Sequence, residues 1–532
     1  MKRNKFYKLI AFFVCGIFSP LHLLGQPTYS SERSEWIYFG TDGKLVYKTT
    51  PNGDRIMDFS YAGYKGGGVV LPDIPVKITV KPSGEGDDTQ TIQTAIDKIS
   101  LLKPDKDGFR GTVFLSPGVY TCSQSITIEK SGIILRGSGS SLENTNKDKI
   151  STIRMTGGKH TAIIIGLSGK NSSKHDNIKT FLTEHYVPSG CSSFSVRSTY
   201  GFNVGDIIDL RHPVTKAWVH FMQMDDLVRD GNPQTWLREG SQLITQRRIK
   251  SITGNRITVD VPLSDSYNAE YLDPPGTEVV QVAISKQLEQ VAIEHIHIIS
   301  PEQEVNHTQE LYTAIRLNGT NCWMKDILIE ETMNSVSVGG QFITLDQVVV
   351  VRKALHLGAS KPAEFAPNAG QILLNRCSVV ADNVWFAATG AGISGPIVFL
   401  NCTFKGDGHI EGHQRWSTGM LLDNCHLPEG GIDFKNRGSM GSGHGWGIGW
   451  AVAWNCVAKS FVVQQPPGAY NWAIGCIGEI VSLPRPFNTE GLLPSGIFES
   501  HGKPVYPQSL YLTQLAERLG KNALKNIGYD LP

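Results

Sequence analysis

Residues 397–425 read IVFLNCTFKGDGHIEGHQRWSTGMLLDNC, and this segment contains one short pattern twice. An apolar run, at 397–400 and again at 420–422, is followed closely by the pairs Asn401-Cys402 and Asn424-Cys425. Recurrence of one local pattern every 20 residues or more (roughly 20 to 50) is typical of a solenoid, in which each repeat adds one coil. The segment therefore predicts a coiled, all-β structure rather than a chain of separate domains.

Further cysteines continue the pattern in both directions. They fall at 322, 377, 456 and 476, and Asn321 and Asn455 directly precede two of them. Strands of adjacent coils lie ~4.8 Å apart with parallel side chains, which is slightly more than the preferred Cβ separation of a disulfide. We therefore expect that each coil stacks its cysteine on the previous one as a buried, reduced thiol. A few true disulfides remain the alternative.

The first 25 residues read as a secretory signal. A basic start, from Lys2 to Lys8, precedes a mostly apolar run at 9–24 and the small residue Gly25. The protein is therefore expected to be exported, either periplasmic or secreted. Without this segment the chain has 46 basic and 49 acidic residues, which argues against a nucleic-acid partner, and no later apolar run reaches the length of a membrane span.

A helix and several short strands open the predicted solenoid. Gly86-Asp87-Asp88-Thr89 provides an acidic N-cap, and the apolar residues that follow at 92, 95, 96 and 99 have helical spacing. The segments 112–120, 125–128 and 132–137 are rich in β-branched residues and are separated by Gly and Pro. A cap helix followed by the first β coils is expected here.

These elements together resemble a known family. The order of an acidic helix cap, VFLSPGVY at 113–120, ITIEKSGIILRGSG at 126–139 and then Asn-Cys coils is similar to the pectate-lyase superfamily of right-handed parallel β-helices. The resemblance covers roughly residues 75–185 and 291–480. It implies a secreted carbohydrate-active protein with a cleft along one sheet, but the superfamily includes lyases, hydrolases, epimerases and non-catalytic tailspikes.

Between residues 186 and 290 the coil pattern stops. The segments 202–210 and 248–260 read as strands of a small inserted β subdomain, with a hairpin at Gly254-Asn255. A polar and aromatic loop is either a flap that contacts substrate or the surface of a satellite domain, and it contains Arg211, His212, Lys216, Trp218, His220 and Trp236. The predicted organisation is a signal peptide (1–25), an N-terminal arm (26–75), the cap helix and first coils (76–185), the insertion (186–290), the main β-helix with the cleft (291–480), and a C-terminal tail with a helix around Leu510, Leu515 and Leu519 that covers the last coil (481–532).

The chemistry is expected between residues 405 and 475. In HIEGHQRW, at 409–416, four ionisable residues recur at every second position, so an extended strand would place all four on one face. Later coils add further polar and aromatic residues that stacking would bring together, and sugar rings offer apolar faces to aromatic side chains. The candidate catalytic residues are His409, Glu411, His413, Arg415, Arg437 and His444. The candidate substrate-binding residues are Trp416, Trp446, Asn436, Gln465, Lys216 and His220.

These residues fit β-elimination across C4–C5 of a uronic acid. Arg437 or Arg415 would neutralise the carboxylate, His413 and His444 would transfer the protons, and Glu411 would orient a histidine. Trp416 and Trp446 would serve as sugar platforms. The substrate is expected to be an acidic polysaccharide or its oligosaccharides, such as ulvan or pectin, because the signal resembles those of polysaccharide-degrading Bacteroidetes.

Several alternatives stay open. A β-helical glycoside hydrolase would need two carboxylates, whereas the acids near the histidines are only Asp407, Glu411 and Asp423. A glycan-binding β-helix without catalysis is the second alternative. Elimination would make the enzyme a polysaccharide lyase or a dehydratase that forms an unsaturated uronate at a non-reducing end, and an overhanging insertion favours the terminal mode. No cofactor is expected: a strand would spread zinc ligands too far apart, and calcium remains the alternative although clustered carboxylates are scarce.

Overall fold

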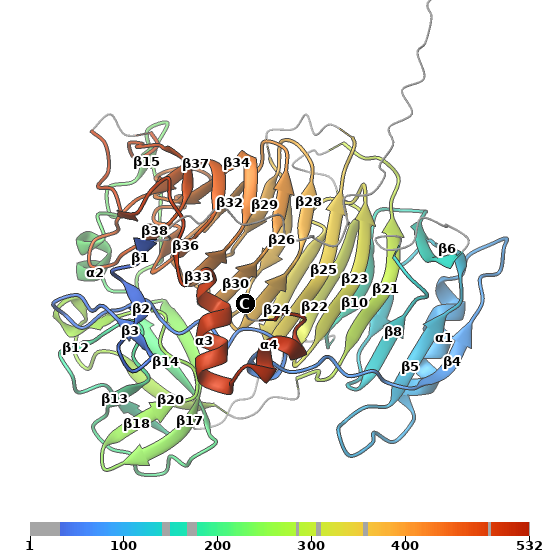
Figure 1. The fold of residues 1–532 in the computed structure, drawn as a ribbon, viewed down its shortest axis with the longest axis horizontal. Coiled ribbons are helices and arrows are strands. Elements are labelled where there is room, and N and C mark those ends of the chain that lie inside the picture. The colour runs from blue at the N-terminus through green and yellow to red at the C-terminus, as the bar shows by residue number, and fades with distance from the viewer. Residues whose placement is uncertain are drawn as a thin grey trace, which may run out of the picture.

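The computed structural model describes residues 32–140, 149–167, 178–282, 287–304, 310–354, 360–487 and 491–530, so the predicted signal segment lies outside them. Within the described residues the chain forms a parallel β-helix in which 27 strands belong to one continuous sheet (Figure 1). The predicted fold class, an all-β solenoid with an inserted β subdomain and terminal helices, is confirmed.

Each coil contributes up to three strands, which define three faces of the β-helix. Face A contains β4 (Val76–Val80), β5 (Gly111–Leu115), β8 (Ile133–Arg136), β27 (Ile372–Asn375), β30 (Ser394–Leu400), β33 (Ser417–Asp423), β35 (Ile448–Gly449), β36 (Val452–Trp454), β38 (Trp472–Ile474) and β40 (Ile497–Glu499). Face B contains β6 (Gly118–Cys122), β9 (Ser151–Met155), β28 (Ser378–Val380), β31 (Thr403–Lys405) and β39 (Ile477–Ile480).

Face C contains β7 (Ile126–Ile128), β10 (Thr161–Ile165), β22 (Thr313–Thr320), β24 (Val336–Gln341), β26 (Ala363–Pro367), β29 (Trp385–Ala388) and β32 (His409–Glu411). Longer strands turn a corner between two faces. From A to B these are β21 (Ala292–Ile299), β23 (Trp323–Glu330) and β25 (Ile343–Val351), and from B to C they are β34 (His426–Phe434) and β37 (Val457–Val463).

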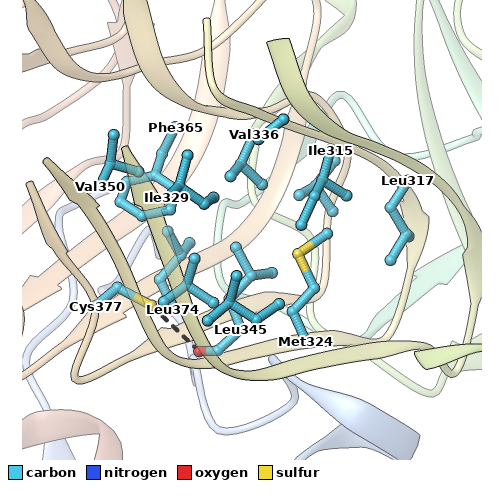
Figure 2. Close-up of a cluster of buried hydrophobic side chains, with 14 of the residues drawn as sticks. Ile315, Leu317, Met324, Ile329, Val336, Leu345, Val350, Phe365, Leu374 and Cys377 are labelled. Carbon is cyan, nitrogen blue, oxygen red and sulfur yellow. Dashed lines mark hydrogen bonds between the residues drawn. The ribbon is translucent and has the colours of Figure 1, made fainter. Parts of the chain in front are cut away.

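The core of the β-helix is filled by ladders of apolar side chains. Alternate residues of each strand point inward, and parallel register stacks Ile315 on Val336 and Val336 on Phe365. Figure 2 shows these side chains meeting those of faces A and B in one closed interior. Full burial of each such side chain contributes about 1.5–3 kcal/mol, so the stacked coils supply the core that no single coil could build.

A ladder of cysteines follows the corner between faces A and B. It contains Cys377, Cys402, Cys425, Cys456 and Cys476, all buried, and all eight cysteines of the described residues are free thiols. Each thiol of the ladder donates to a carbonyl of the preceding coil, as Cys377 does to Leu345 in Figure 2. The prediction of stacked, reduced thiols is thus confirmed for these five.

Cys322 does not belong to this ladder, and the expectation that it begins the stack is wrong. It follows β22 at the corner between faces C and A, whereas the ladder lies at the next corner of the coil. The ladder position in the earlier coils is held by Ile296, Ile327 and Val348. The Asn-Cys pair therefore occurs at two different corners.

The first coil is covered by α1 (Thr89–Ser100), as the sequence predicts. Its apolar residues, including Ile92 and Ile96, are buried against the core. The predicted capping bond to the N-cap residue Asp88 is absent from the described residues. The amide of Thr89 donates to Asp87 instead, while the carboxylate of Asp88 accepts from the amides of Ser83 and Thr121 and so ties the helix start to the first coil.

The insertion forms a six-stranded antiparallel sheet beside the β-helix (Figure 1). Its hairpin turns at Gly254, where φ is 57°, and this predicted turn is confirmed. The helix α2 (Lys216–Phe221) and two short ladders, β12 with β19 and β15 with β16, complete it. The sheet contains β11 (Lys179–Phe181), β20 (Glu278–Val282), β14 (Ile207–Pro213), β17 (Gln242–Thr253), β18 (Arg256–Val259) and β13 (Ser193–Ser195), and the short ladders contain β12 (Tyr186–Val187), β19 (Tyr267–Asn268), β15 (Val228–Arg229) and β16 (Asn232–Pro233).

The two ends of the chain cover face A together. The predicted C-terminal helix is α3 (Leu510–Leu519), followed by α4 (Asn522–Asn526), and Figure 1 shows both lying across this face. Leu510 and Leu515 are buried there with Phe59 of the N-terminal arm, while Leu519 is half exposed. The expectation that this helix covers the last coil is wrong, because Ser509 and Tyr511 bind Asp423 in the middle of the β-helix.

The N-terminal arm includes the short strands β1 (Glu32–Arg33), β2 (Ile37–Phe39) and β3 (Leu45–Tyr47) and the 3-10 turn η1 (Tyr64–Gly66). β1 pairs in parallel with β41 (Val505–Tyr506) of the C-terminal tail, and the amide of Phe59 donates to Gln514 of α3. The arm and the tail therefore form one layer on face A.

Candidate functional site

The strand that carries the predicted histidines is shorter than the sequence suggests. β32 ends at Glu411, and the chain then turns, with φ at +50° for Arg415 and +65° for Trp416. His409 and Glu411 point away from the core, whereas Ile410 between them is fully buried in it. The expectation that four ionisable residues share one strand face is therefore wrong, because a turn places the residues after Glu411.

Two carboxylates lie beneath the histidines on face C. Glu411 and Asp433 are register partners in adjacent coils, and both side chains are almost completely buried. His413 binds Glu411 through Nδ1, and Nδ1 of His409 lies 2.9 Å from Asp433. Nζ of Lys435 lies 2.6 Å from Asp433 and 3.8 Å from Glu411. The sequence thus builds two histidine–carboxylate pairs, one coil apart, with an ammonium group between them.

The charge state of Asp433 follows from its neighbours. Burial alone would raise its pKa, but Lys435 and His409 stabilise the carboxylate and lower the pKa to about 2. Asp433 is therefore ionised at neutral pH and holds both basic side chains in place.

Arg437 lies at the centre of the site. Its Nη1 donates to the carbonyl of His413 at 2.9 Å, lies 3.2 Å from Glu411, and donates to Nδ1 of His444 at 2.9 Å. The guanidinium is also 5.3 Å from the ring centroid of Trp385, within reach of a cation–π interaction. We refer to His409, His413, Lys435, Arg437 and His444 as the basic cluster.

His444 is a neutral imidazole in this setting. Burial lowers its pKa to about 3, together with the positive charge of Arg437 and the nearby His413 and Arg415. Because Nδ1 accepts a hydrogen bond from Arg437, the ring proton is on Nε2. The ring lies 4.9 Å from that of His413, so His444 offers a donor beside the second histidine.

The insertion borders the loop that carries His444. A Cβ on Gly445 would lie 2.3 Å from the ring of Trp236, so only glycine permits this contact. Arg415 links the two segments, since its Nε donates to the carbonyl of Trp236 at 2.7 Å and Nη2 donates to that of Ser442 at 2.9 Å. Arg415 is thus engaged in holding the insertion against the loop.

The two tryptophans predicted as sugar platforms are buried. Trp416 is 4% exposed and Trp446 is 1% exposed, and they pack with Trp218 and Trp236 of the insertion. Their indole N–H groups donate to Asp265 and to a backbone carbonyl. Neither ring offers a face to a ligand, so their expected role is wrong; they attach the insertion to the β-helix.

The structure does not bring the remaining predicted binding residues into the cluster. The Asn436 side chain is buried and accepts from the amide of Gly438, which shapes the loop instead. Gln465 is held by the carbonyl of Pro494 through its backbone. Lys216 and His220 are exposed on α2, and no contact joins either of them to the basic cluster within the part of the chain that the structure describes.

Three contributing residues were missed from the sequence. Asp433 and Lys435 follow the same alternation in GIDFKNR, at 431–437, that singled out 409–415, and stacking by one coil would have found them. Trp385 sits one coil earlier, with its ring 5.6 Å from that of His413. Asp423, counted earlier among the nearby acids, lies on face A beneath α3.

The described residues contain neither a candidate metal site nor a candidate membrane-spanning helix. Among them, no group of three or more His, Cys, Asp or Glu side chains has a geometry that could hold a metal ion. None of the helices in this part of the chain has the length and apolar character needed to cross a membrane.

Comparisons with known proteins give similarity at the level of fold. No family model matches the chain, and no curated protein matches it. The tailspike protein gp49 of Pseudomonas phage LKA1 aligns at 11% identity over 77% of this chain and 71% of its own, with a TM-score of 0.30. The A-module of the mannuronan C-5 epimerase AlgE4 of Azotobacter vinelandii aligns at 12% identity over 77% and 96%, with a TM-score of 0.20.

A third solved structure, YbhC of Escherichia coli, aligns at 11% identity over 88% of this chain and 89% of its own, with a TM-score of 0.23. At such identities the similarity concerns the fold alone.

Proposed function

We propose that the protein is a carbohydrate lyase that performs β-elimination across C4–C5 of a uronic acid. The observation that carries this proposal is the layering of the site. The side chains of His409 and His413 are 32% and 24% exposed, whereas those of Glu411 and Asp433 are buried beneath them. A ligand on face C therefore meets the imidazoles and the partly exposed ammonium group of Lys435, with the guanidinium of Arg437, whose side chain is 5% exposed, next to them. Such groups suit an anionic sugar and proton transfer.

The residues divide into roles by geometry. Arg437 and the Nε2–H of His444 are donors that would hold the uronate carboxylate and make its C5 proton more acidic. Glu411 accepts from Nδ1 of His413, which places the lone pair on Nε2. This nitrogen lies 2.9 Å from Nη1 of Arg437, and it would act as the base once Arg437 has turned to the uronate carboxylate. His409, oriented in the same way by Asp433, is the proton donor for the leaving oxygen.

The proposed elimination transfers one proton to His413 and one proton from His409. The C5 proton passes to Nε2 of His413, the electrons of the C5–H bond form the C4=C5 double bond, and the C4–O bond breaks. The departing oxygen takes a proton from His409. If the departing group is a sugar, the enzyme cleaves a chain; if it is a hydroxyl, the enzyme releases water.

Hydrolysis is the weaker candidate because of burial and charge. A glycosidase needs one carboxylic acid that is protonated and one carboxylate that reaches the sugar or a water. Asp433 has a pKa of about 2, so it cannot serve as the acid near neutral pH. Glu411 has no exposed surface and is bound by His413 and Arg437. Both carboxylates act instead by positioning the basic groups.

The expected substrate is a polyuronate of the ulvan or pectin kind, or its oligosaccharides. The insertion is attached beside the loop of His444 through Trp236 and Arg415. A wall at this side of the site favours attack at a chain end over attack within a long chain. This supports the terminal mode, including the dehydratase reaction.

The proposal is tested by ultraviolet absorbance during incubation of the mature protein with uronate polysaccharides and their saturated oligosaccharides. A rise from a conjugated 4,5-unsaturated uronate is expected, and mass spectrometry then separates chain cleavage from loss of one water. Arg437→Gln and His444→Gln should each abolish the rise, whereas Arg316→Gln, an exposed arginine of the same face, should not. New reducing ends without absorbance would overturn elimination.

A further inference from the structure

A cavity lies at a corner of the β-helix that the basic cluster does not occupy. It has a volume of about 430 Å³ and sits at the corner between faces A and B, under the chain at 64–71 and beside the chain at 525–528. Its floor is formed by β21, β23, β25 and β27. We call it the corner cavity. Figure 1 shows α4 and the segment leading to β4 crossing this part of face A.

The floor of the corner cavity belongs to a regular row of side chains. At this corner the coils from β21 onward each have one residue with φ in the left-handed region, including Asp326, Gln347 and Arg376. In later coils the same position is Asn, and those side chains are bound by the C-terminal segment: Nδ2 of Asn401 donates to the hydroxyl of Tyr529, and Nδ2 of Asn455 donates to the carbonyl of Val505. In the earlier coils the row lines the cavity instead.

The acidic groups of the cavity already have partners. Asp326 lies 2.7 Å from Nδ1 of His295 and accepts from the hydroxyl of Ser140. Asp346 accepts from Arg376 at 2.8 Å and from Asn375 at 3.0 Å. Asp346 is therefore neutralised by Arg376, whereas Asp326 is hydrogen-bonded to neighbouring side chains.

Two ammonium groups of the cavity lack such partners. Lys325 lies on the floor and Lys525 on the wall formed by α4. Neither lysine has an ion pair with any residue that the structure describes. Lys325, Lys525 and Arg376 face Asp326 and Asp346 in the lining, so the cavity has a net charge of +1 with His295 neutral, and the ammonium groups of the two lysines come from two different elements.

We propose that the corner cavity is a second ligand site, which binds a monosaccharide-sized anion of the uronate class. A volume of about 430 Å³ falls in the range of small-molecule pockets, roughly 300–1,000 Å³. Lys325 and Lys525 supply the charge for a carboxylate. Gln347 supplies an amide for hydroxyl groups, Asn526 offers its amide oxygen while its Nδ2 donates to the carbonyl of Gly68, and the exposed side chain of Val70 supplies an apolar surface for a ring.

The site is distinct from the basic cluster in residues and in place. None of the residues that line it belongs to the basic cluster. Occupancy would join the N-terminal arm, the β-helix and α4, so the ligand would stabilise the layer that covers face A. The inference does not depend on the reaction proposed above.

The test uses ligand-observed NMR titration of the mature protein with D-glucuronate, with D-glucose as the uncharged probe and inorganic sulfate as the bare anion. All proteins carry Arg437→Gln to remove carboxylate binding at the basic cluster. We expect saturable binding of glucuronate that Lys325→Gln combined with Lys525→Gln weakens at least tenfold, and weaker binding of glucose and of sulfate. The two lysine substitutions alone, in the otherwise unchanged protein, should leave elimination activity unaltered.

Several results would overturn the inference. These are no saturable glucuronate binding, equal binding of glucose, or binding that the lysine substitutions leave unchanged. Sulfate binding as tight as that of glucuronate would show a simple anion site and would equally reject a sugar. Circular dichroism of the double variant ensures that a loss of binding reports on the cavity, since both lysines reach solvent and are not expected to affect folding.

Discussion

Gly431 lies directly over His409 in the next coil of face C. The two residues are register partners, and a Cβ on Gly431 would lie 2.5 Å from Nδ1 of His409. That nitrogen is the one that binds Asp433. The absence of a side chain at 431 is therefore what allows the histidine–carboxylate pair to form.

Gly431→Ala should lower activity without removing any catalytic group. The added methyl would push the His409 ring away from Asp433, and we expect a loss of about 100-fold, at the lower end of what general acid catalysis contributes. Kinetics of Gly431→Ala, His409→Ala and the double variant check this. If both act through the same ring, the double variant should be no worse than His409→Ala, whereas additive losses would contradict the role of Gly431.

His413→Gln should reduce turnover by about 100- to 10,000-fold, because it removes the base that Glu411 orients. The initial rate of absorbance increase measures the effect. His426→Gln is the matched control, since His426 is exposed on face B. Retention of full activity by His413→Gln would exclude it as the base.

Trp385→Ala should raise KM more than it lowers kcat. Its ring contacts the guanidinium of Arg437 and lies 5.5 Å from Nζ of Lys361, so it borders the place where a sugar must lie. We expect a KM increase of about tenfold, of the size that one aromatic contact provides. Trp385→Phe should restore most of the affinity. A change confined to kcat would show that the ring positions Arg437 rather than substrate.

Asp423 should make the folded state less stable as pH rises. Burial raises its pKa from 3.8 to about 7, so between these values the folded protein holds a proton that the unfolded chain has released. The contribution is complete below pH 3.8 and is lost as pH rises to about 7, a change on the order of 4 kcal/mol.

The measurement is urea unfolding of the protein and of Asp423→Asn from pH 5 to pH 9. The variant keeps one oxygen to accept from Ser509 and Tyr511, and it should lack most of this slope. Parallel curves for the two proteins would show that Asp423 does not titrate in this range.

The buried cysteine ladder should be inert to thiol reagents. The ladder thiols have no exposed surface beyond about one per cent, and Cys122 and Cys322 outside the ladder are buried as well, so a reagent in solution does not reach them while the protein is folded. In the native protein we expect Ellman's reagent to reach only Cys191, which is partly exposed, and to reach the others only after unfolding in urea. Rapid reaction of several thiols in the native state would contradict the ladder.

The sequence predicts the fold well because the residues that shape each coil lie close together in the chain. Asn401 and Asn424 occupy a corner where φ is near +50°, and Asn tolerates this left-handed conformation better than most residues. The cysteine that follows each of them points into the core. Both features depend on the chain within one coil, so the repeat is visible without any long-range information.

The site is predicted less completely because it depends on where strands end. His409, Glu411, His413, Arg437 and His444 do come together, and stacking in register explains this. The roles of Trp416 and Trp446 could not be foreseen, since their burial depends on the insertion, whose Trp218 and Trp236 are 180 to 228 residues away in the chain. Asp433 was missed because the run that contains it, GIDFKNR at 431–437, has no histidine.

The pairing of β1 with β41 has a consequence for the order of folding. Glu32 and Arg33 bind a strand at 505–506, and Phe59 is held by Gln514, so the arm synthesised first binds to the tail synthesised last. Contacts of such long sequence separation form late, because loop closure must precede them. Face A is consequently completed only after the whole polypeptide is available, and a chain released early would leave its apolar surface open to solvent.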